Sequence, residues 1–179
     1  MFDPYQIIQK YYMPGTKLYY VLVKHSEQVR DKALEVAMKH PELNANIDFI
    51  AEAAMLHDIG IYLCNAPRIF CQGIHQYIEH GYLGAEILCK EGLQQHALVC
   101  ERHTGTGISL KKILENNLPL PKRNMVPVSI EEQIICYADK FFSKTALDSM
   151  HDPDKIRLMI GKHGVENITI FNGWHARFS

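Results

Sequence analysis

The chain has 179 residues, of which 47% are hydrophobic and 22% are charged, and its formal net charge is −1. This length predicts one domain that is large enough to bury a hydrophobic core. Proteins built around a nucleic-acid backbone carry a basic excess, so the charge balance argues against an extensive nucleic-acid surface. No segment reaches the roughly 18 consecutive apolar residues of a membrane span, and the N-terminus lacks the features of a signal peptide. We therefore expect a cytoplasmic protein without a membrane partner.

Cap and stop signals predict a series of helices in the first half of the chain. A capping residue precedes most of them, and a proline or glycine follows. The expected helices cover residues 3–12, 17–23, 26–40 and 49–59, with Thr16, Ser26 and Asp48 as N-caps of the last three. Residues 62–73 contain a proline and three aromatic side chains without clear periodicity, and they predict a loop.

The second half of the chain also predicts helices, separated by glycines and a proline-rich loop. Ser129 and Glu132 form the spacing of a capping box at the start of one of them. The expected helices cover residues 82–90, 98–103, 109–117, 130–142, 153–162 and 165–178. Strand signals are almost absent, so we predict an all-α fold around a single core.

The dipeptide His57-Asp58 ends an apolar helix, which is an unusual place for two polar groups. Both side chains lose hydration there and need a partner that offsets the loss. A divalent metal ion is one such partner, because neutral imidazole and carboxylate are both metal ligands. A pairing of the two side chains at a frayed helix end is the simpler alternative for the dipeptide alone.

Six residues stand out because they lie at or near the ends of apolar helices or, for the last, inside one. They are His25, His57, Asp58, His80, His103 and Asp139. The other histidines lie in polar or irregular surroundings and are expected at the surface. They are His40, His75, His96, His151, His163 and His175.

The order His25, His57-Asp58, Asp139 resembles the HD-domain superfamily of metal-dependent phosphohydrolases. The segment His57-Asp58-Ile59-Gly60 matches the motif of its HDIG subgroup, and the resemblance covers roughly residues 16–145. It implies an HD-domain helical bundle over residues 16–150, with an N-terminal helix over residues 1–15. Residues 151–179 would form a helical extension packed on this bundle.

The resemblance also implies a binuclear metal site. His25, His57, Asp58 and Asp139 fill the places of the first metal's ligands, and His80 and His103 look like the additional ligands of two-metal members. Asp58 is the natural bridge between the ions, because a carboxylate has two oxygens. Two divalent ions are implied, and Fe, Mn, Zn, Ni, Co and Mg all remain open.

The expected reaction is hydrolysis of a small phosphate ester, with a nucleotide as the favoured substrate. Two metal ions can hold a bridging hydroxide as the nucleophile and clamp the phosphoryl oxygens. Asp58 would then take a catalytic role by orienting this hydroxide. Many HDIG proteins carry a Lys or Arg directly after the motif, whereas this chain has Ile61. We expect Ile61 and Tyr62 to line an apolar part of the site.

Three further residues are candidates for substrate binding because they neighbour expected metal ligands. Arg102 and Lys140 could donate charge-assisted hydrogen bonds to phosphate oxygens, or they could point to solvent or pair with Glu101 and Glu132. Thr104 could bind an anion through backbone N–H groups, or it could belong to a helix C-terminal turn.

Two other functions use the same ligands. A di-iron oxygenase of the myo-inositol oxygenase type holds two irons with a set of this kind, and a non-catalytic module could bind a metal or a nucleotide. Retained ligands favour the enzyme. The sequence leaves the substrate, the metal and the oligomeric state open.

Overall fold

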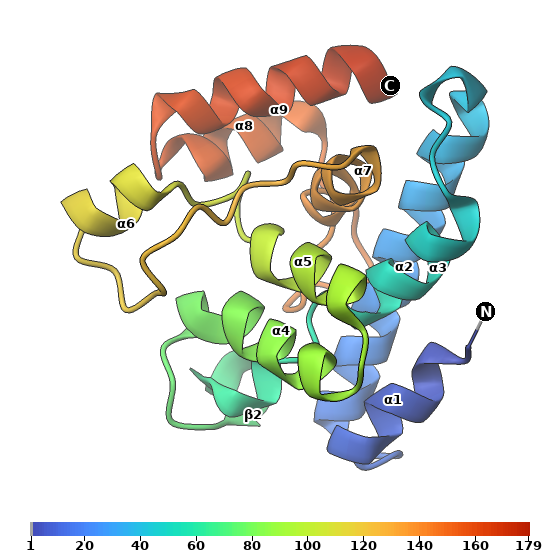
Figure 1. The fold of residues 1–179 in the computed structure, drawn as a ribbon, viewed down its shortest axis with the longest axis vertical. Helices are drawn as coiled ribbons and strands as arrows, with labels where there is room; N and C mark the ends of the chain where they lie inside the picture. Colours follow the sequence, from blue (N-terminus) through green and yellow to red (C-terminus); the bar gives the residue numbers. More distant parts are fainter. Residues whose placement is uncertain (1) are drawn as a thin grey trace.

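The computed structural model describes residues 2–179, and helices account for most of it (Figure 1). The helices are α1 (Pro4–Tyr11), α2 (Lys17–Lys39), α3 (Ile47–Leu56), α4 (His80–Lys90), α5 (Gln94–Arg102), α6 (Leu110–Glu115), α7 (Ile130–Asp139), α8 (Pro153–Gly161) and α9 (Val165–Phe178). Short 3₁₀ turns cover Pro41–Leu43, Ile61–Leu63, Pro67–Ile69 and Tyr77–Glu79. The predicted all-α class and single domain are confirmed.

Helix α2 is one continuous helix of 23 residues, where two shorter helices were expected. Thr16 caps it as predicted, through its side-chain hydroxyl. Ser26, the expected cap of a second helix, lies buried in the middle of α2 beside His25. Leu22, Ser26 and Val29 follow the helical spacing of three to four residues, so they share one buried face. The polar pair therefore lies on the buried face of a continuous helix and does not break it.

Two other helix boundaries differ from the prediction. The N-cap of α3 is Asn46, whose side-chain oxygen accepts a hydrogen bond from the Phe49 N–H at 3.0 Å. Asp48 lies inside the first turn instead, where a negative charge complements the helix dipole. Helix α7 ends at Asp139, three residues earlier than expected, so that this carboxylate stands at the helix end.

Residues 62–73 were expected to be an unstructured loop, but they contain a small hairpin. Strands β1 (Asn65–Ala66) and β2 (Cys71–Gln72) pair in antiparallel register around the turn Pro67–Ile69. The hairpin is too short for a hydrophobic alternation to reveal it in the sequence. Phe70 enters β2 with a positive φ of 64°.

Two large clusters of apolar side chains and a smaller third one form the interior. One lies between α2, α3, α7 and the C-terminal helices α8 and α9, which run side by side at one end of the molecule (Figure 1). Phe171, Trp174 and Phe178 belong to this cluster together with Val29 and Tyr137, so segment 151–179 shares its core with the preceding helices.

The second cluster joins α1, the start of α2, the end of α3 and α4. Ile61 is fully buried in it, and the Tyr62 ring packs against Tyr12 with 5.2 Å between ring centroids. The expectation that Ile61 lines the site is therefore wrong, because this side chain fills the core behind the motif.

Two histidines that were expected at the surface are buried. His96 is 9% exposed and its Nε2 lies 3.2 Å from Glu52 Oε2, while His151 is 5% exposed. A buried carboxylate partner explains His96, and no local sequence signal reveals that partner. No helix within residues 2–179 combines the length and apolar character that a membrane crossing requires.

Candidate metal centre

The fold brings all six candidate ligands to one buried place. They form two groups that share Asp58, and within each group the ligand atoms lie within 4.8 Å of one another. The first group is His25, His57, Asp58 and Asp139, and the second is Asp58, His80 and His103.

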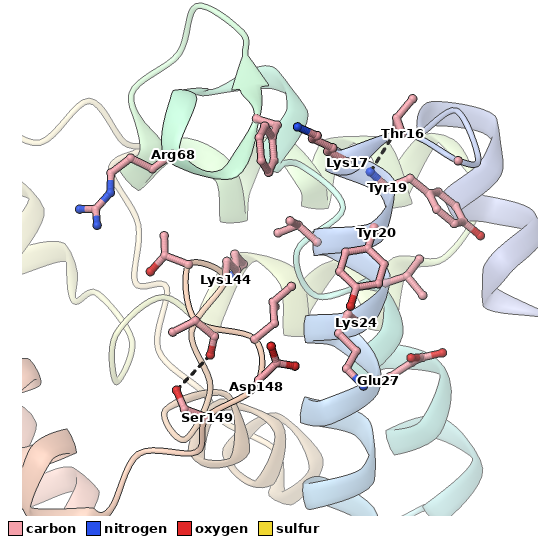
Figure 2. Close-up of a pocket in the computed structure, with 17 residues that line it drawn as sticks. Thr16, Lys17, Tyr19, Tyr20, Lys24, Glu27, Arg68, Lys144, Asp148 and Ser149 are labelled. Atoms are coloured by element: carbon pink, nitrogen blue, oxygen red, sulfur yellow. Dashed lines mark hydrogen bonds between the residues drawn. The ribbon is translucent and has the colours of Figure 1, made fainter.

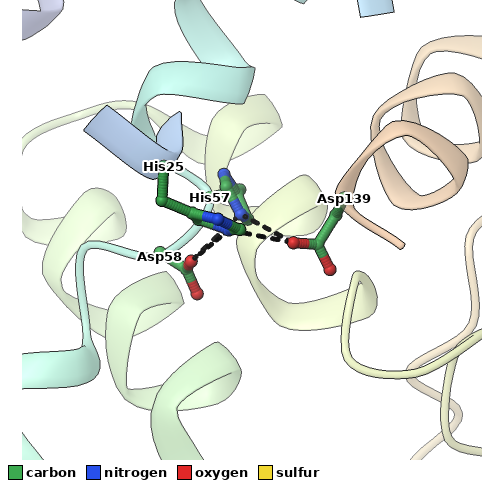
Figure 3. A group of neighbouring side chains, drawn as sticks. All are labelled: His25, His57, Asp58 and Asp139. Carbon is green, nitrogen blue, oxygen red and sulfur yellow. Dashed lines mark hydrogen bonds and ion pairs between the residues drawn. The ribbon is translucent and has the colours of Figure 1, made fainter. Parts of the chain in front are cut away.

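Five helices contribute to this convergence. His25 comes from the middle of α2, whereas the other ligands stand at helix ends: His57 closes α3, His80 opens α4, His103 closes α5 and Asp139 ends α7. Figure 3 shows the first group, with the two histidines between the two carboxylates. Helix ends position side chains from separate elements at one point, which a single helix cannot do.

Asp58 uses its two oxygens on different sides of the centre. Oδ2 lies 3.2 Å from His25 Nε2 and 3.1 Å from His57 Nε2. Oδ1 lies 3.4 Å from the Nε2 atoms of both His80 and His103. Asp139 adds its Oδ1 to the first side, 3.0 Å from His25 Nε2. One carboxylate thus faces two separate histidine pairs.

Three of the imidazoles are oriented by the same type of local hydrogen bond. The Nδ1 atoms of His57, His80 and His103 lie 2.7, 2.6 and 2.7 Å from the backbone carbonyl oxygen three residues earlier. Each Nδ1–H therefore donates to a carbonyl near a helix end, which fixes the tautomer and turns the Nε2 lone pair toward the centre. Metal-binding histidines are typically held in this way.

The donor set fits metal ions on two further grounds. His80 Nε2 and His103 Nε2 face each other at 3.0 Å, and with both Nδ1 atoms protonated, their lone pairs repel unless a cation lies between them. In the part of the chain that the structure describes, His57 Nε2 and Asp58 Oδ1 are buried without a well-oriented hydrogen bond. Buried polar atoms of this kind require a partner, and a divalent ion bound by imidazole and carboxylate supplies one.

The protonation states agree with this assignment. Burial and the adjacent His103 lower the pKa of His80 to about 3, and burial also lowers that of His103, so both imidazoles are neutral ligands at pH 7. Burial opposes protonation of His57 too, but Asp58 and Asp139 outweigh it and raise its pKa to about 9. The first group therefore attracts positive charge.

Two lysines form ion pairs with the two carboxylates of the site. Lys144 Nζ lies 2.6 Å from Asp58 Oδ2, and Lys140 Nζ lies 2.6 Å from Asp139 Oδ2. Burial would raise the pKa of the Asp58 carboxyl, but the Lys144 ammonium and His57 hold it well below its usual range. Lys144 could not be predicted from the sequence, because it lies outside any motif in an irregular segment after α7.

The other substrate-binding candidates lie differently. Arg102 directs its guanidinium at the buried Glu132, with 3.0 Å to each carboxylate oxygen, which is the alternative pairing that the sequence offered. Thr104 belongs to the turn after α5, where its carbonyl accepts a hydrogen bond from the Gly107 N–H. Thr104 and His80 both line a small cavity of about 310 Å³.

Two larger cavities open beside the ligands. The central cavity, of about 420 Å³, is lined by Asp139, Lys140 and Lys144 together with apolar side chains of α8. The side cavity, of about 1100 Å³, lies between the first turns of α2 and the segment 144–149 (Figure 2). Of the six candidate ligands, Asp139 lines the central cavity and none lines the side cavity, so of these two the central cavity is the one that brings a small molecule to a ligand.

Comparisons with known proteins identify the class. The model of the HD domain family matches residues 22–143. This range contains all six candidate ligands, from His25 to Asp139. This chain belongs to the HD domain family.

Three proteins of known sequence are similar to this chain. An uncharacterized protein of Methanocaldococcus jannaschii is 31% identical over 157 residues, which is 84% of this chain and 85% of that protein. The tRNA (cytidine(56)-2′-O)-methyltransferases of Thermoplasma volcanium and Picrophilus torridus are 36% and 33% identical over 68% and 69% of this chain. These matches span 32% of each methyltransferase, so the chain corresponds to about a third of their length.

A solved structure supports the fold. The HD domain of the Listeria monocytogenes phosphodiesterase PgpH, in complex with cyclic-di-AMP, matches 99% of this chain and 88% of its own, with a TM-score of 0.56. The two sequences are 21% identical, so the likeness establishes the HD fold. The family and the buried His/Asp cluster together are consistent with divalent-metal binding and hydrolase chemistry.

Proposed function

We propose that this protein is a metal-dependent phosphohydrolase that acts on a nucleotide or another small phosphate ester. One observation carries the proposal: Asp58 faces His25 and His57 with one oxygen and His80 and His103 with the other. This arrangement suits a carboxylate that bridges two divalent ions, which is the typical layout of binuclear phosphoester hydrolases.

The two ions would share the six side chains unequally. His25, His57 and Asp139 would hold the first, His80 and His103 the second, and Asp58 both. Four imidazoles in the set favour Fe, Mn, Zn, Co or Ni over Mg, which prefers oxygen ligands. Bound ions would supply Lewis acidity and a nucleophilic water at neutral pH.

The protein's own groups would bind and orient the substrate around this centre. Lys140 and Lys144 border the central cavity with ammonium groups that can donate charge-assisted hydrogen bonds to phosphoryl oxygens. Hydrolysis adds the water oxygen to phosphorus, breaks the bond to the leaving oxygen and returns a proton to that oxygen. Asp58, fixed among four imidazoles, would orient the attacking water, so its role is positional and not that of a free base.

Several features support a nucleotide as the substrate. The central cavity has a volume within the roughly 300–1,000 Å³ of small-molecule sites, and its walls combine cations with apolar side chains. The structurally similar phosphodiesterase was solved with a cyclic dinucleotide. The methyltransferase names of two relatives describe proteins three times longer than the matched region, so methyl transfer is not part of this proposal.

The proposal is tested by purifying the protein without chelator and measuring bound metals by mass spectrometry. Nucleotides and dinucleoside polyphosphates are then screened for phosphate release, with and without chelation. We expect about two metal equivalents per chain and a phosphate ester that is hydrolysed only by the loaded protein. Oxygen uptake is followed in parallel, because a di-iron oxygenase would consume oxygen and release no phosphate.

A further inference from the structure

The side cavity is larger than the central cavity, and a phosphoryl group bound at the metal centre would not fill it. Its volume of about 1100 Å³ compares with about 420 Å³ for the central cavity. Helix α2 forms one wall and the segment 144–149 the other, with Tyr20 and Lys24 on α2 opposite Asp148 and Ser149 (Figure 2). A mononucleotide whose phosphate lies at the metal centre would leave one of the two cavities empty.

The side cavity adjoins the central cavity. Arg68, Lys144 and Thr145 line both of them. Lys144 also contacts Asp58, with 2.6 Å between Nζ and Oδ2, so a residue shared by the two cavities reaches the metal centre. A ligand with its phosphoryl group beside Lys144 would extend into both spaces, one on each side of the phosphorus.

Cations without acidic partners surround the side cavity. Among the described residues, Lys17, Lys24 and Arg68 form no ion pair, although each lines this space. Two carboxylates, those of Glu27 and Asp148, also border it, and Glu27 accepts a hydrogen bond from the Tyr5 hydroxyl at 2.6 Å. The remaining positive charge favours an anionic ligand, such as a phosphorylated sugar.

Aromatic rings stand at the same cavity. Phe70 is 45% exposed and Tyr20 is 58% exposed, and both line this space. Phe70 also adopts a φ of 64°, a left-handed conformation that is unfavourable for a bulky residue without local compensation. An exposed ring held in this backbone conformation can stack on a flat ring such as a nucleobase. Lys17 Nζ lies over the Phe70 ring, 5.3 Å from its centroid, so this cation covers one face of the ring and leaves the opposite face for stacking.

From this combination, we propose that the side cavity is a second nucleoside-binding subsite. The substrate would then be a dinucleotide, with one nucleoside in each cavity and the scissile phosphate between them at the metal centre. This inference rests on the proposed phosphohydrolase function and narrows its substrate class. Phe70 would stack on the second base, while Lys24 and Arg68 would contact its sugar-phosphate part.

The test measures binding directly, so that it does not depend on turnover. Titration calorimetry compares AMP with a hydrolysis-resistant phosphorothioate analogue of the linear dinucleotide pApA. We expect the dinucleotide to bind at least about 10-fold more tightly than AMP, since base stacking on an aromatic ring has an effect of this size. Phe70→Asn should abolish this advantage and preserve the fold, because Asn tolerates the left-handed backbone.

Two variants serve as controls. Phe70→Tyr keeps the ring and should retain the preference for the dinucleotide, whereas Lys24→Ala should weaken dinucleotide binding several-fold in a salt-dependent manner. Lys90→Ala, on the exposed end of α4, should change neither ligand's affinity. Equal affinity for AMP and the dinucleotide in the wild type, or full dinucleotide affinity in Phe70→Asn, would overturn the inference.

The outcome separates the subsite from the enzyme function. Phe70-dependent dinucleotide binding without hydrolysis of any phosphate ester would uphold the subsite and remove the hydrolase. Phosphate release from mononucleotides, without tighter binding of the dinucleotide, would uphold the hydrolase function and remove the subsite. A six-residue oligoadenylate tests whether the natural ligand is an RNA end or a free dinucleotide. If the oligoadenylate binds more tightly than pApA and this binding depends on Phe70, the ligand is an RNA end. If it binds equally or more weakly than pApA, the ligand is a free dinucleotide.

Discussion

Lys144 places its ammonium nitrogen 2.6 Å from Asp58 Oδ2, so the carboxylate at the centre of the site is paired with a cation from a distant segment. The Lys144 side chain is 13% exposed and Asp58 is fully buried. In this arrangement the Lys144 ammonium neutralises the negative charge of Asp58. The proposed metal ions would neutralise the same charge when they are bound.

We predict that Lys144→Met destabilises the metal-free protein more than the metal-loaded protein. Breaking a buried ion pair on one side costs about 3 kcal/mol, because it leaves an unpaired buried charge. Metal ions at Asp58 would supply that missing charge, so the loss should fall below about 1 kcal/mol in the loaded protein. Urea unfolding with and without chelator measures both values.

The control for this prediction is Lys111→Met. Lys111 pairs with Glu115 at the surface, where an ion pair contributes little, so its removal should change stability by less than about 0.5 kcal/mol in both states. Equal losses for Lys144→Met with and without metal would show that Lys144 stabilises Asp58 independently of metal binding.

Close backbone packing behind the site leads to a second prediction. A Cβ added at Gly60 would lie 2.2 Å from the His80 carbonyl oxygen and 2.5 Å from the Gly84 nitrogen. Gly60→Ala should therefore push the start of α4 away from His57-Asp58. We expect a loss of about 2–3 kcal/mol in unfolding free energy and the loss of about one metal equivalent, since His80 would move with its helix.

Gly173→Ala is the matched control, because a Cβ at this position in α9 meets nothing within 4 Å. Alanine is favoured over glycine inside a helix, so this variant should gain about 0.5–1 kcal/mol and keep its metal. The Gly60 prediction fails if Gly60→Ala unfolds at the wild-type urea concentration with full metal content.

The sequence supported the prediction of the six candidate ligands because each is a polar residue where apolar periodicity requires a core residue or a helix end. Lys144 and His96 gave no such signal. Their partners, Asp58 and Glu52, lie on other elements, and a lysine or histidine in irregular surroundings reads as a surface residue. Contacts between distant segments depend on how the helices pack, which helical periodicity alone does not specify.

The same limit explains two further errors of placement, those of Ser26 and Ile61. Ser26 carries the residue type of an N-cap, and only its position on the buried face of α2 shows that the helix continues through it. Ile61 follows the motif directly, yet the 3₁₀ turn Ile61–Leu63 directs it into the core. The turn geometry, and not the residue order, decides which side chains face the site.

His96 allows a prediction about pH. Burial lowers the pKa of His96 below its usual 6.5, although Glu52 partly opposes this effect. The folded state therefore binds this proton less readily than the unfolded state, so the contribution of His96 to stability is present above pH 6.5 and is lost as pH falls through that value. We expect the stability difference between the wild type and His96→Gln to shift against the wild type from pH 7 to pH 5.

The slope measures the effect, with a maximum of about 1.4 kcal/mol per pH unit for one proton. Urea titrations at half-unit intervals in a buffer of constant ionic strength give the difference at each pH. A difference that does not change between pH 7 and pH 5 would mean that His96 titrates alike in the folded and unfolded states.

The last prediction is that the site is binuclear and that hydrolysis requires the second metal. His103 contacts only the Oδ1 side of Asp58, while His57 contacts the Oδ2 side. His103→Ala should therefore remove about one metal equivalent and leave the other in place. Turnover should fall by about 100-fold or more, since one of the two groups that stabilise the phosphoryl charge is lost.

His57→Ala should instead empty the first group, because Asp58 and Asp139 lose the imidazole between them. His40→Ala is the control: its Nδ1 lies 3.0 Å from Glu42 at the surface, so metal content and turnover should stay at wild-type values. Metal content per chain is measured beside phosphate release for all three variants. Because His80 and His103 face each other at 3.0 Å, a one-metal hydrolase would leave their two neutral Nε2 lone pairs unbridged. Full metal content and full activity in His103→Ala would therefore contradict the binuclear mechanism and restrict the reaction to the first group.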